Sequence, residues 1–280
     1  MSICRENPNY YFSKKDLAKM KQHLRLNRCL TQEVLKLFNL YEDNHLIRDR
    51  NHKIYFYHPN IKINYFENID TKQKAYFLGL IFADGSISYK SNNRLTFEIG
   101  FSLKDKILLL KLSKIIGFEN KYIRKRKERN FWRISINSNG FCKHLIRHGM
   151  IVGKRKTYHI KLPRFHLKTL YLAFLLGFFD GDGTANTTRI TTASLLFLKQ
   201  LKHKFKIQYN PKKVESLFKV KNKIYKGCAY IMYIGGNLIN ELLDNYSESL
   251  QRKRKRFSSY DQRLNTKSMK NFHKKIKHSN

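Results

Sequence analysis

Two short segments of the chain are near copies of each other. Residues 77–85 read FLGLIFADG and residues 175–183 read LLGFFDGDG. Each segment is apolar, carries a small residue at two positions four apart, and ends in Asp-Gly. The aspartates of these endings, Asp84 and Asp182, lie one in each half of the chain. The repetition predicts an internal duplication in which two acids serve the same purpose.

The small residues of each segment are spaced for helix packing. Gly79 and Ala83 fall on one face of a helix, as do Gly177 and Gly181, because residues four apart stack on each other. Small residues at this spacing let two helix backbones approach closely, by analogy with membrane helices. The other positions are mostly large and apolar, as a buried helix requires. The pattern therefore predicts two buried helices in direct contact.

The Asp-Gly endings predict where these helices stop. Gly85 and Gly183 fit the left-handed residue that commonly follows a helix C-terminus. Asp84 and Asp182 then lie in the last turn, where the helix dipole disfavours an acid by about 0.3–1 kcal/mol. Two such ends side by side, next to free backbone carbonyls, are unfavourable unless a cation binds there. Carboxylate and carbonyl oxygens are hard ligands that suit Mg²⁺.

The two segments resemble the paired motifs of LAGLIDADG homing endonucleases, in the single-chain form that has two motifs. The resemblance covers roughly residues 65–260 and includes the lead-in FENIDTKQKA at residues 66–75. It implies an α+β fold, a duplicated αββαββα arrangement whose two pseudo-symmetric halves form a saddle of antiparallel sheets over DNA. It also implies a monomer that cuts each strand of a long target with Mg²⁺, or another divalent cation such as Mn²⁺.

The resemblance extends to the residues of a metal site. The eighth motif position, which is the metal-binding acid of the family, falls on Asp84 and Asp182. We expect the carbonyls near Ala83 and Gly181 to complete a site for divalent ions between the two motif helices. Such ions assist phosphodiester hydrolysis, so no Ser-His-Asp arrangement is required.

The sixth motif position and two downstream lysines complete the candidate set. The sixth position is Asp180 in the second copy and Phe82 in the first, and it is not a metal ligand in the family. Lys156 and Lys253 stand after the two repeats, where the family has a basic residue near the scissile phosphate. We expect these two lysines to steady the charge that develops on phosphate.

The charge of the chain points to a polyanionic partner. Among 280 residues, 57 are Lys or Arg and 20 are Asp or Glu, which gives a net charge of +37. So large an excess opposes compaction unless a polyanion balances it, so we expect double-stranded DNA, with intron RNA as a second partner. We find no apolar segment long enough to span a bilayer and no secretory leader. An intracellular protein follows, in an organelle, a bacterium or a phage-infected cell.

Other classes of protein remain as alternatives. A non-cleaving nucleic-acid-binding protein of the same fold, either an RNA maturase or a transcription regulator, would share the architecture. Two intact acids favour cutting. A basic structural or ribosome-associated protein would explain the charge but leaves the paired Asp-Gly helices unexplained.

The DGDG run at residues 180–183 is not a calcium loop, since Thr184 to Arg189 supply none of the further acids that such a loop needs. The four cysteines are scattered, and we expect reduced thiols.

The order of apolar patterns divides the chain into four parts. Residues 1–64 form a basic extension, 65–160 the first repeat, 161–260 the second repeat, and 261–280 a basic mobile tail. Within the extension, residues 24–40 show helical spacing, which predicts either a helix-turn-helix unit or an extension that packs on the core. Each repeat is expected to run helix, strand pair, helix, strand pair, helix.

Alternating patterns mark the strands. Residues 95–101 alternate strictly, with Thr96 and Glu98 facing outward, and residues 132–136 alternate again. In the second repeat we expect a strand at 189–191 and a hairpin of 218–225 with 229–234, which turns near Lys226-Gly227. Helices are expected at 104–116, 141–148, 195–205 and 238–246.

The outward faces of these strands are candidates for reading DNA. A two-stranded ribbon fits the major groove, where each base pair shows a distinct pattern of donors and acceptors. Surrounding lysines and arginines would hold phosphates and add salt-dependent affinity. Because the halves differ in sequence, the predicted target is asymmetric. The candidate base readers are Glu98, Arg133, Ser135, Asn137, Arg189, Thr191, Lys219 and Lys221.

Overall fold

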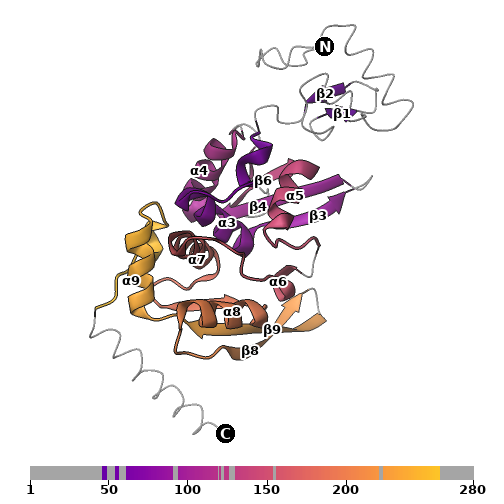
Figure 1. Cartoon of the computed structure of the whole chain (residues 1–280). Helices are drawn as coiled ribbons and strands as arrows, with labels where there is room; N and C mark the ends of the chain where they lie inside the picture. Colours follow the sequence, from indigo (N-terminus) through magenta and orange to yellow (C-terminus); the bar gives the residue numbers. More distant parts are fainter. Residues whose placement is uncertain are drawn as a thin grey trace. The chain divides into compact units, whose positions relative to one another are not determined.

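A computed structural model of the chain describes the residues that carry both motifs (Figure 1). The described ranges are 46–48, 54–56, 61–90, 94–118, 120, 123–125, 130–153, 156–220 and 223–258. The predicted helix at 24–40 and the tail 261–280 lie outside them. Within the extension, β1 (Leu46–Arg48) pairs antiparallel with β2 (Ile54–Phe56), a hairpin that the sequence analysis did not predict.

The chain divides into two compact units. The first comprises Met1–Asn68 and Gly85–His148, and the second comprises Ile69–Asp84 and Gly149–Asn280. The first motif helix thus packs with the second repeat rather than with the strands that follow it. The reason is the helix pair described below, in which glycines bring the two motif backbones into direct contact.

The first unit is a mixed α+β layer built on an antiparallel sheet. The strands lie in the order β3-β4-β6-β5, and each neighbouring pair is antiparallel. Its elements are η3 (Ile63–Phe66), β3 (Ser86–Lys90), β4 (Arg94–Ser102), η5 (Leu103–Asp105), α4 (Lys106–Ile116), β5 (Arg124–Lys125), β6 (Phe131–Asn137) and α5 (Asn139–Arg147).

The core of the first unit follows from strand alternation. Phe97 and Ile99 of β4 are buried and pair with the buried Ile136 and Ile134 of β6, and helices α4 and α5 pack on this apolar face. One expectation is wrong here. Thr96 shares the opposite face with Glu98, as predicted, but it is fully buried because its hydroxyl donates to the Asn137 side chain across the ladder (2.7 Å).

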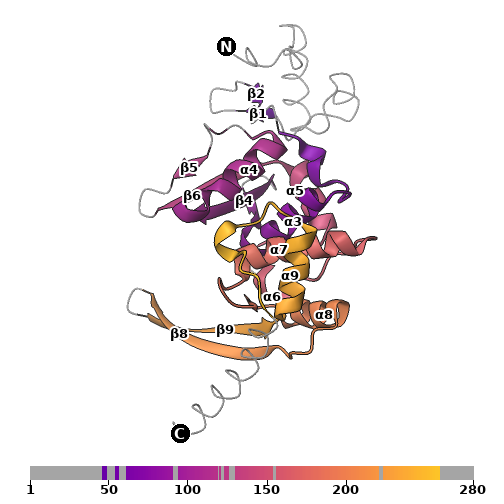
Figure 2. The ribbon, with the colours of Figure 1, turned by 90° about the vertical axis from the view of Figure 1, so that its left-hand side faces the viewer.

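The second unit packs helices on a smaller antiparallel sheet, ordered β7-β9-β8. Figure 2 shows β8 and β9 as a long curved ribbon and α8 as a separate helix at the other end of that sheet. The elements are α3 (Lys72–Asp84), α6 (Lys156–His159), α7 (Lys168–Asp182), β7 (Arg189–Thr192), α8 (Leu195–Phe205), β8 (Lys212–Val220), β9 (Lys223–Tyr233), α9 (Gly236–Asn245) and η7 (Gln251–Lys253).

Two details of the second repeat differ from expectation. The hairpin turns between Val220 and Lys223, not at Lys226-Gly227, which lies inside the ladder opposite Leu217 and Ser216. A glycine in a strand interior does not by itself locate a turn. The repeat also copies the first only in part, since the strand after the motif is reduced to a single bridge between Gly183 and Ile190.

The two motif helices are deeply buried, with eight consecutive buried residues in α3 and eleven in α7. Even so, none of the helices in the described ranges combines the length and the apolarity that crossing a bilayer requires.

Candidate metal and nucleic-acid site

The two motif helices, α3 and α7, are in backbone contact, and Figure 1 shows them side by side. A Cβ added at Gly79 would overlap the Phe174 carbonyl oxygen and lie 2.9 Å from the Phe178 nitrogen. At Gly177, an added Cβ would overlap the Tyr76 carbonyl oxygen. Only glycine fits either position, so the predicted close approach through small residues is confirmed.

The same contact continues to the C-terminal ends of both helices. A Cβ added at Gly181 would overlap the Ala83 methyl group and lie 2.7 Å from Asp84 Oδ2. The Asp84 carboxylate therefore rests on the backbone of the residue that precedes Asp182. Asp84 is exposed and Asp182 is half-buried, so both carboxylates lie where solvent reaches the ends of the helices.

The capping glycine of the second motif has a different role from the one predicted. Gly183 is not left-handed: its φ is −82° and its ψ is 153°, which is extended backbone. Glycine is needed there for space, because an added Cβ would overlap the Phe179 carbonyl oxygen and lie 2.7 Å from the Phe179 ring.

The donor set at the helix ends suits a hard divalent cation. Two carboxylates lie at the negative ends of two helix dipoles, and the missing side chain of Gly181 leaves a cradle that a Cβ would fill. Among the described residues there is no cluster of three or more His, Cys, Asp and Glu side chains. A cation held by Asp84 and Asp182 would thus depend on water or substrate for its other ligands, as Mg²⁺ commonly does.

A second acid of the α7 motif is buried beside this end. Asp180 is 3% exposed; its Oδ2 accepts from the Tyr76 hydroxyl (2.5 Å) and from the Leu250 backbone N–H (2.7 Å). Its Oδ1 is buried, and no hydrogen bond to it occurs among the described residues. Burial raises the pKa of Asp180 to about 6, against the lowering effect of its hydrogen bonds to Tyr76 and Leu250. Burial and the Asp180 carboxylate raise the pKa of Tyr76, which keeps its hydroxyl a donor.

One of the two predicted basic helpers lies at the same helix end. The Lys253 side chain reaches from η7, and the residue is 5% exposed. Its ammonium donates to the carbonyl oxygens of Phe179 (3.1 Å), Asp180 and Gly181 (3.1 Å). The Gly181 carbonyl, a predicted metal ligand, therefore already has a cation beside it. Lys156, the other predicted helper, begins α6, and the structure does not describe its side chain.

Four of the predicted base readers come together on one face of the first unit's sheet. Glu98 of β4 lies opposite Ser135 of β6. The Ser135 hydroxyl donates to Glu98 Oε1 (3.1 Å), and an Arg133 nitrogen lies 3.8 Å from the same oxygen. Asn137 lies further along this face and accepts from Thr96. All four are half-buried, so they form a polar row that solvent reaches.

The remaining predicted base readers belong to the second unit. Arg189 and Thr191 lie on the face of β7 opposite the buried Ile190, and the Arg189 guanidinium donates to the Thr184 hydroxyl (3.0 Å). Lys219 lies in β8 opposite Ile224, and Lys221 lies outside the described residues.

The sequence analysis missed the residues that support the helix ends. Asp180 stood there only as the sixth motif position, at which the first copy departs with Phe82, and neither Tyr76 nor Leu250 had a predicted role. The signal was present, since an acid in an otherwise apolar helix interior has to find partners when it is buried.

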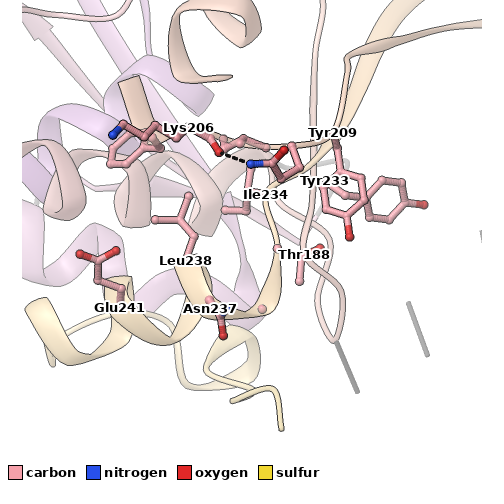
Figure 3. A pocket seen from close by; sticks show the side chains of 13 residues that line it. Thr188, Lys206, Tyr209, Tyr233, Ile234, Asn237, Leu238 and Glu241 are labelled. Carbon is pink, nitrogen blue, oxygen red and sulfur yellow. Dashed lines mark hydrogen bonds between the residues drawn. The ribbon is translucent and has the colours of Figure 1, made fainter. Parts of the chain in front are cut away.

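A cavity of about 370 Å³ lies elsewhere in the second unit, between the end of α8, the end of β9 and the start of α9 (Figure 3). Its polar lining includes Lys206, Tyr209, Tyr233, Asn237 and Glu241. The predicted site residues do not line it, so it is separate from the motif site.

One family model matches the second half of the chain. Residues 169–277 match the family model of the LAGLIDADG-like domain. No curated protein sequence matches the chain.

The solved structures that are similar to this chain include three complexes with DNA. The I-LtrWI LAGLIDADG homing endonuclease bound to target DNA is 15% identical, with a TM-score of 0.35, and the match covers 78% of this chain and 92% of that one. The homing endonuclease I-WcaI bound to its DNA recognition sequence is 16% identical, with a TM-score of 0.39 over 71% and 95% of the two chains. A variant of I-DmoI, in complex with its nicked target DNA and in the presence of Mn, is 15% identical, with a TM-score of 0.38 over 67% and 98%.

The motif at 175–183 lies inside the matched domain, and the motif at 77–85 packs against it through equivalent glycines. The chain therefore contains a region similar to the LAGLIDADG-like domain, at residues 169–277, and carries a second copy of the motif outside that region, at residues 77–85.

Proposed function

We propose that this protein is a site-specific DNA endonuclease that hydrolyses one phosphodiester in each strand of a long, asymmetric target, acting as a monomer. The observation that carries the proposal is the contact between the motif helices, which sets Asp84 Oδ2 against Gly181, the residue before Asp182. Both acids lie where the helix dipoles disfavour a negative charge, so a bound cation would stabilise their position.

Each residue of the site has a distinct part in the proposed reaction. Asp84 and Asp182 would hold divalent cations at the ends of α3 and α7, with the Ala83 carbonyl beside them. When bound, such a cation supplies Lewis acidity for phosphodiester hydrolysis. Gly181 keeps the space between the acids open, and Lys156 is the candidate that would steady charge on the phosphate.

The polar row of the first unit supports the DNA-binding part of the proposal. A carboxylate can accept from the amino group of cytosine, and arginine can donate to guanine, so Glu98 and Arg133 are suited to reading base edges. The net charge of +37 adds affinity for phosphates that does not depend on sequence. The four residues on one sheet face thus supply specificity, and the lysines and arginines around them supply affinity.

The experiment is a cleavage assay on DNA that carries the recognised site, with Mg²⁺ or Mn²⁺ added to metal-free protein. We expect the wild type to cut both strands, and we expect Asp84→Asn and Asp182→Asn to lose double-strand cleavage while they still bind DNA. Glu241→Gln, which changes a half-buried acid in an ion pair with Lys168, is the matched control and should cut normally.

Two results decide against the proposal. Normal cutting by both aspartate variants would reject the assignment of the acids. A wild type that binds the nucleic acid tightly but never cuts it, with any divalent cation, would favour the non-cleaving alternative of an RNA maturase or a transcription regulator.

A further inference from the structure

The ammonium of Lys253 is the buried cation of the second motif's helix end. Its three N–H groups have three acceptors, the last carbonyl oxygens of α7 on Phe179, Asp180 and Gly181. Lys253 is 5% exposed, whereas Lys255, two residues further, is exposed. The donors of Lys253 are therefore fully used within the protein, before any DNA is present.

This arrangement answers two needs of the α7 end at once. The final carbonyls of a helix have no partner within the helix, and here Lys253 binds those of Asp180 and Gly181. The third carbonyl that it binds, on Phe179, also accepts from the Gly183 backbone N–H (2.8 Å). The same end carries Asp180, Asp182 and the negative pole of the dipole, so a positive charge is favourable there. A buried ammonium is costly unless it is paired, and this site pairs it.

The segment that carries Lys253 is attached at a second point. The Leu250 backbone N–H donates to Asp180 Oδ2, and Asp180 also accepts from Tyr76 of α3. The segment from Leu250 to Lys253 thus holds the last turn of α7 from two sides. The first motif has Phe82 in place of Asp180, so this attachment through the sixth motif position belongs to α7 alone.

We propose that Lys253 is a positioning residue for Asp182: it fixes the last turn of α7 by binding three of its carbonyls, and it does not contact a phosphate of the DNA. The proposal rests on the function proposed above, in which Asp84 and Asp182 hold the cations, and it adds that each acid serves the cleavage of one strand. Because Lys253 binds α7 and not α3, loss of its ammonium slows the cleavage of one strand more than that of the other.

The first arm of the test needs neither DNA nor cleavage. In DNA-free wild type, acetylation of lysines followed by mass spectrometry should leave Lys253 unmodified while Lys255 reacts. Lys253→Met, which keeps the length of the apolar stem, should lower Tm by roughly 5 °C or more. Lys255→Met is the matched control and should leave Tm unchanged. Equal modification of the two lysines in the wild type would overturn the proposal even if the Lys253→Met variant could not be purified.

The second arm uses DNA below the Tm of the variant. If Lys253 makes no phosphate contact, the slope of log K against log salt concentration is unchanged in Lys253→Met, whereas loss of one phosphate contact reduces it by about 0.9. The DNA Kd should also stay within about twofold. The rate of cleavage, measured for each strand separately, should fall about tenfold or more on one strand. DNA that is nicked only in the other strand should then accumulate.

The outcomes separate the roles of Lys253. A reduced salt slope would show a phosphate contact and overturn the proposal, and an equal loss of rate on both strands would show a general structural role and overturn it as well. A wild type that does not cut at all refutes the proposed function instead, and the labelling, Tm and salt arms still decide whether Lys253 is held by the helix end.

Discussion

Gly79 and Gly177 make the same contact from opposite helices. Gly79 faces the carbonyl of Phe174, three residues before Gly177, and Gly177 faces the carbonyl of Tyr76, three residues before Gly79. The contact is therefore reciprocal, as expected for two copies of one helix related by an approximate two-fold axis. It places the ends of the helices together and so determines where Asp84 and Asp182 lie.

A single methyl group at this contact should be costly. We expect Gly177→Ala to lower the free energy of unfolding by about 3 kcal/mol, because the added Cβ would overlap a backbone carbonyl that cannot move without separating the helices. Equilibrium unfolding in urea, followed by circular dichroism, measures the loss.

The control for this substitution is another glycine-to-alanine change. Gly153 has a φ of +88° and no atom within 4 Å of an added Cβ, so Gly153→Ala suffers only backbone strain of about 1–2 kcal/mol. If Gly177→Ala were no more destabilising than Gly153→Ala, the close approach of the helices would be disproved.

The hydrogen bonds to Asp180 predict different stabilities for two substitutions that both remove its charge. Asp180→Asn keeps an oxygen that can accept from Tyr76 and Leu250, whereas Asp180→Ala leaves both buried donors without an acceptor. Each unsatisfied donor costs about 1–3 kcal/mol, so we expect the alanine variant to be less stable than the asparagine variant by about 2–6 kcal/mol. Thermal and urea unfolding of the two proteins at one pH provide the comparison, and equal stabilities would contradict it.

The buried thiol of Cys142 should be inert in the folded protein. Cys142 is 0% exposed on α5, and burial raises its pKa to about 12, so only about one thiol in ten thousand is ionised at pH 8. Cys228 is half-buried in β9 and should react first with a thiol reagent. Peptide mass spectrometry after timed labelling distinguishes the two. Fast labelling of Cys142 in native protein would show that the packing of α5 on β4 is looser than described.

The sequence was sufficient for the features that depend on local pattern. The small residues four apart predicted the contact of α3 with α7, and alternation predicted the buried face of β4, because both follow from helix and strand periodicity. Thr96 escaped prediction because its burial depends on Asn137, a partner on another strand. The turn of the long hairpin escaped it because a glycine inside a strand resembles a turn glycine.

The support of the site could not be predicted for a related reason. Lys253 and Leu250 reach the end of α7 from about 70 residues further along the chain. The family resemblance and its position after the repeat placed Lys253 near the phosphate, but neither reveals the carbonyls that surround its ammonium. Such long-range partners follow from the tertiary fold and not from any local spacing.

The polar row on β4 and β6 predicts which substitutions change specificity and which change only affinity. Arg133 lies beside Glu98 on the sheet face opposite the core, so Arg133→Ala should weaken discrimination by about 1–3 kcal/mol at one or two adjoining base pairs of the target. Lys114 is exposed on α4, which packs on the core face of the same sheet. Lys114→Ala should therefore leave the preference at every base pair unchanged.

A binding selection from a randomised target library, repeated with each variant, measures these preferences position by position. Glu98→Gln adds a sharper comparison, since it keeps an acceptor for Ser135 but removes the charge beside Arg133. We expect Glu98→Gln to alter the base preference at the same base pairs as Arg133→Ala, because the Arg133 guanidinium lies beside Glu98 Oε1. If both variants selected the wild-type sequence unchanged, this face of the sheet would not be the surface that reads the target.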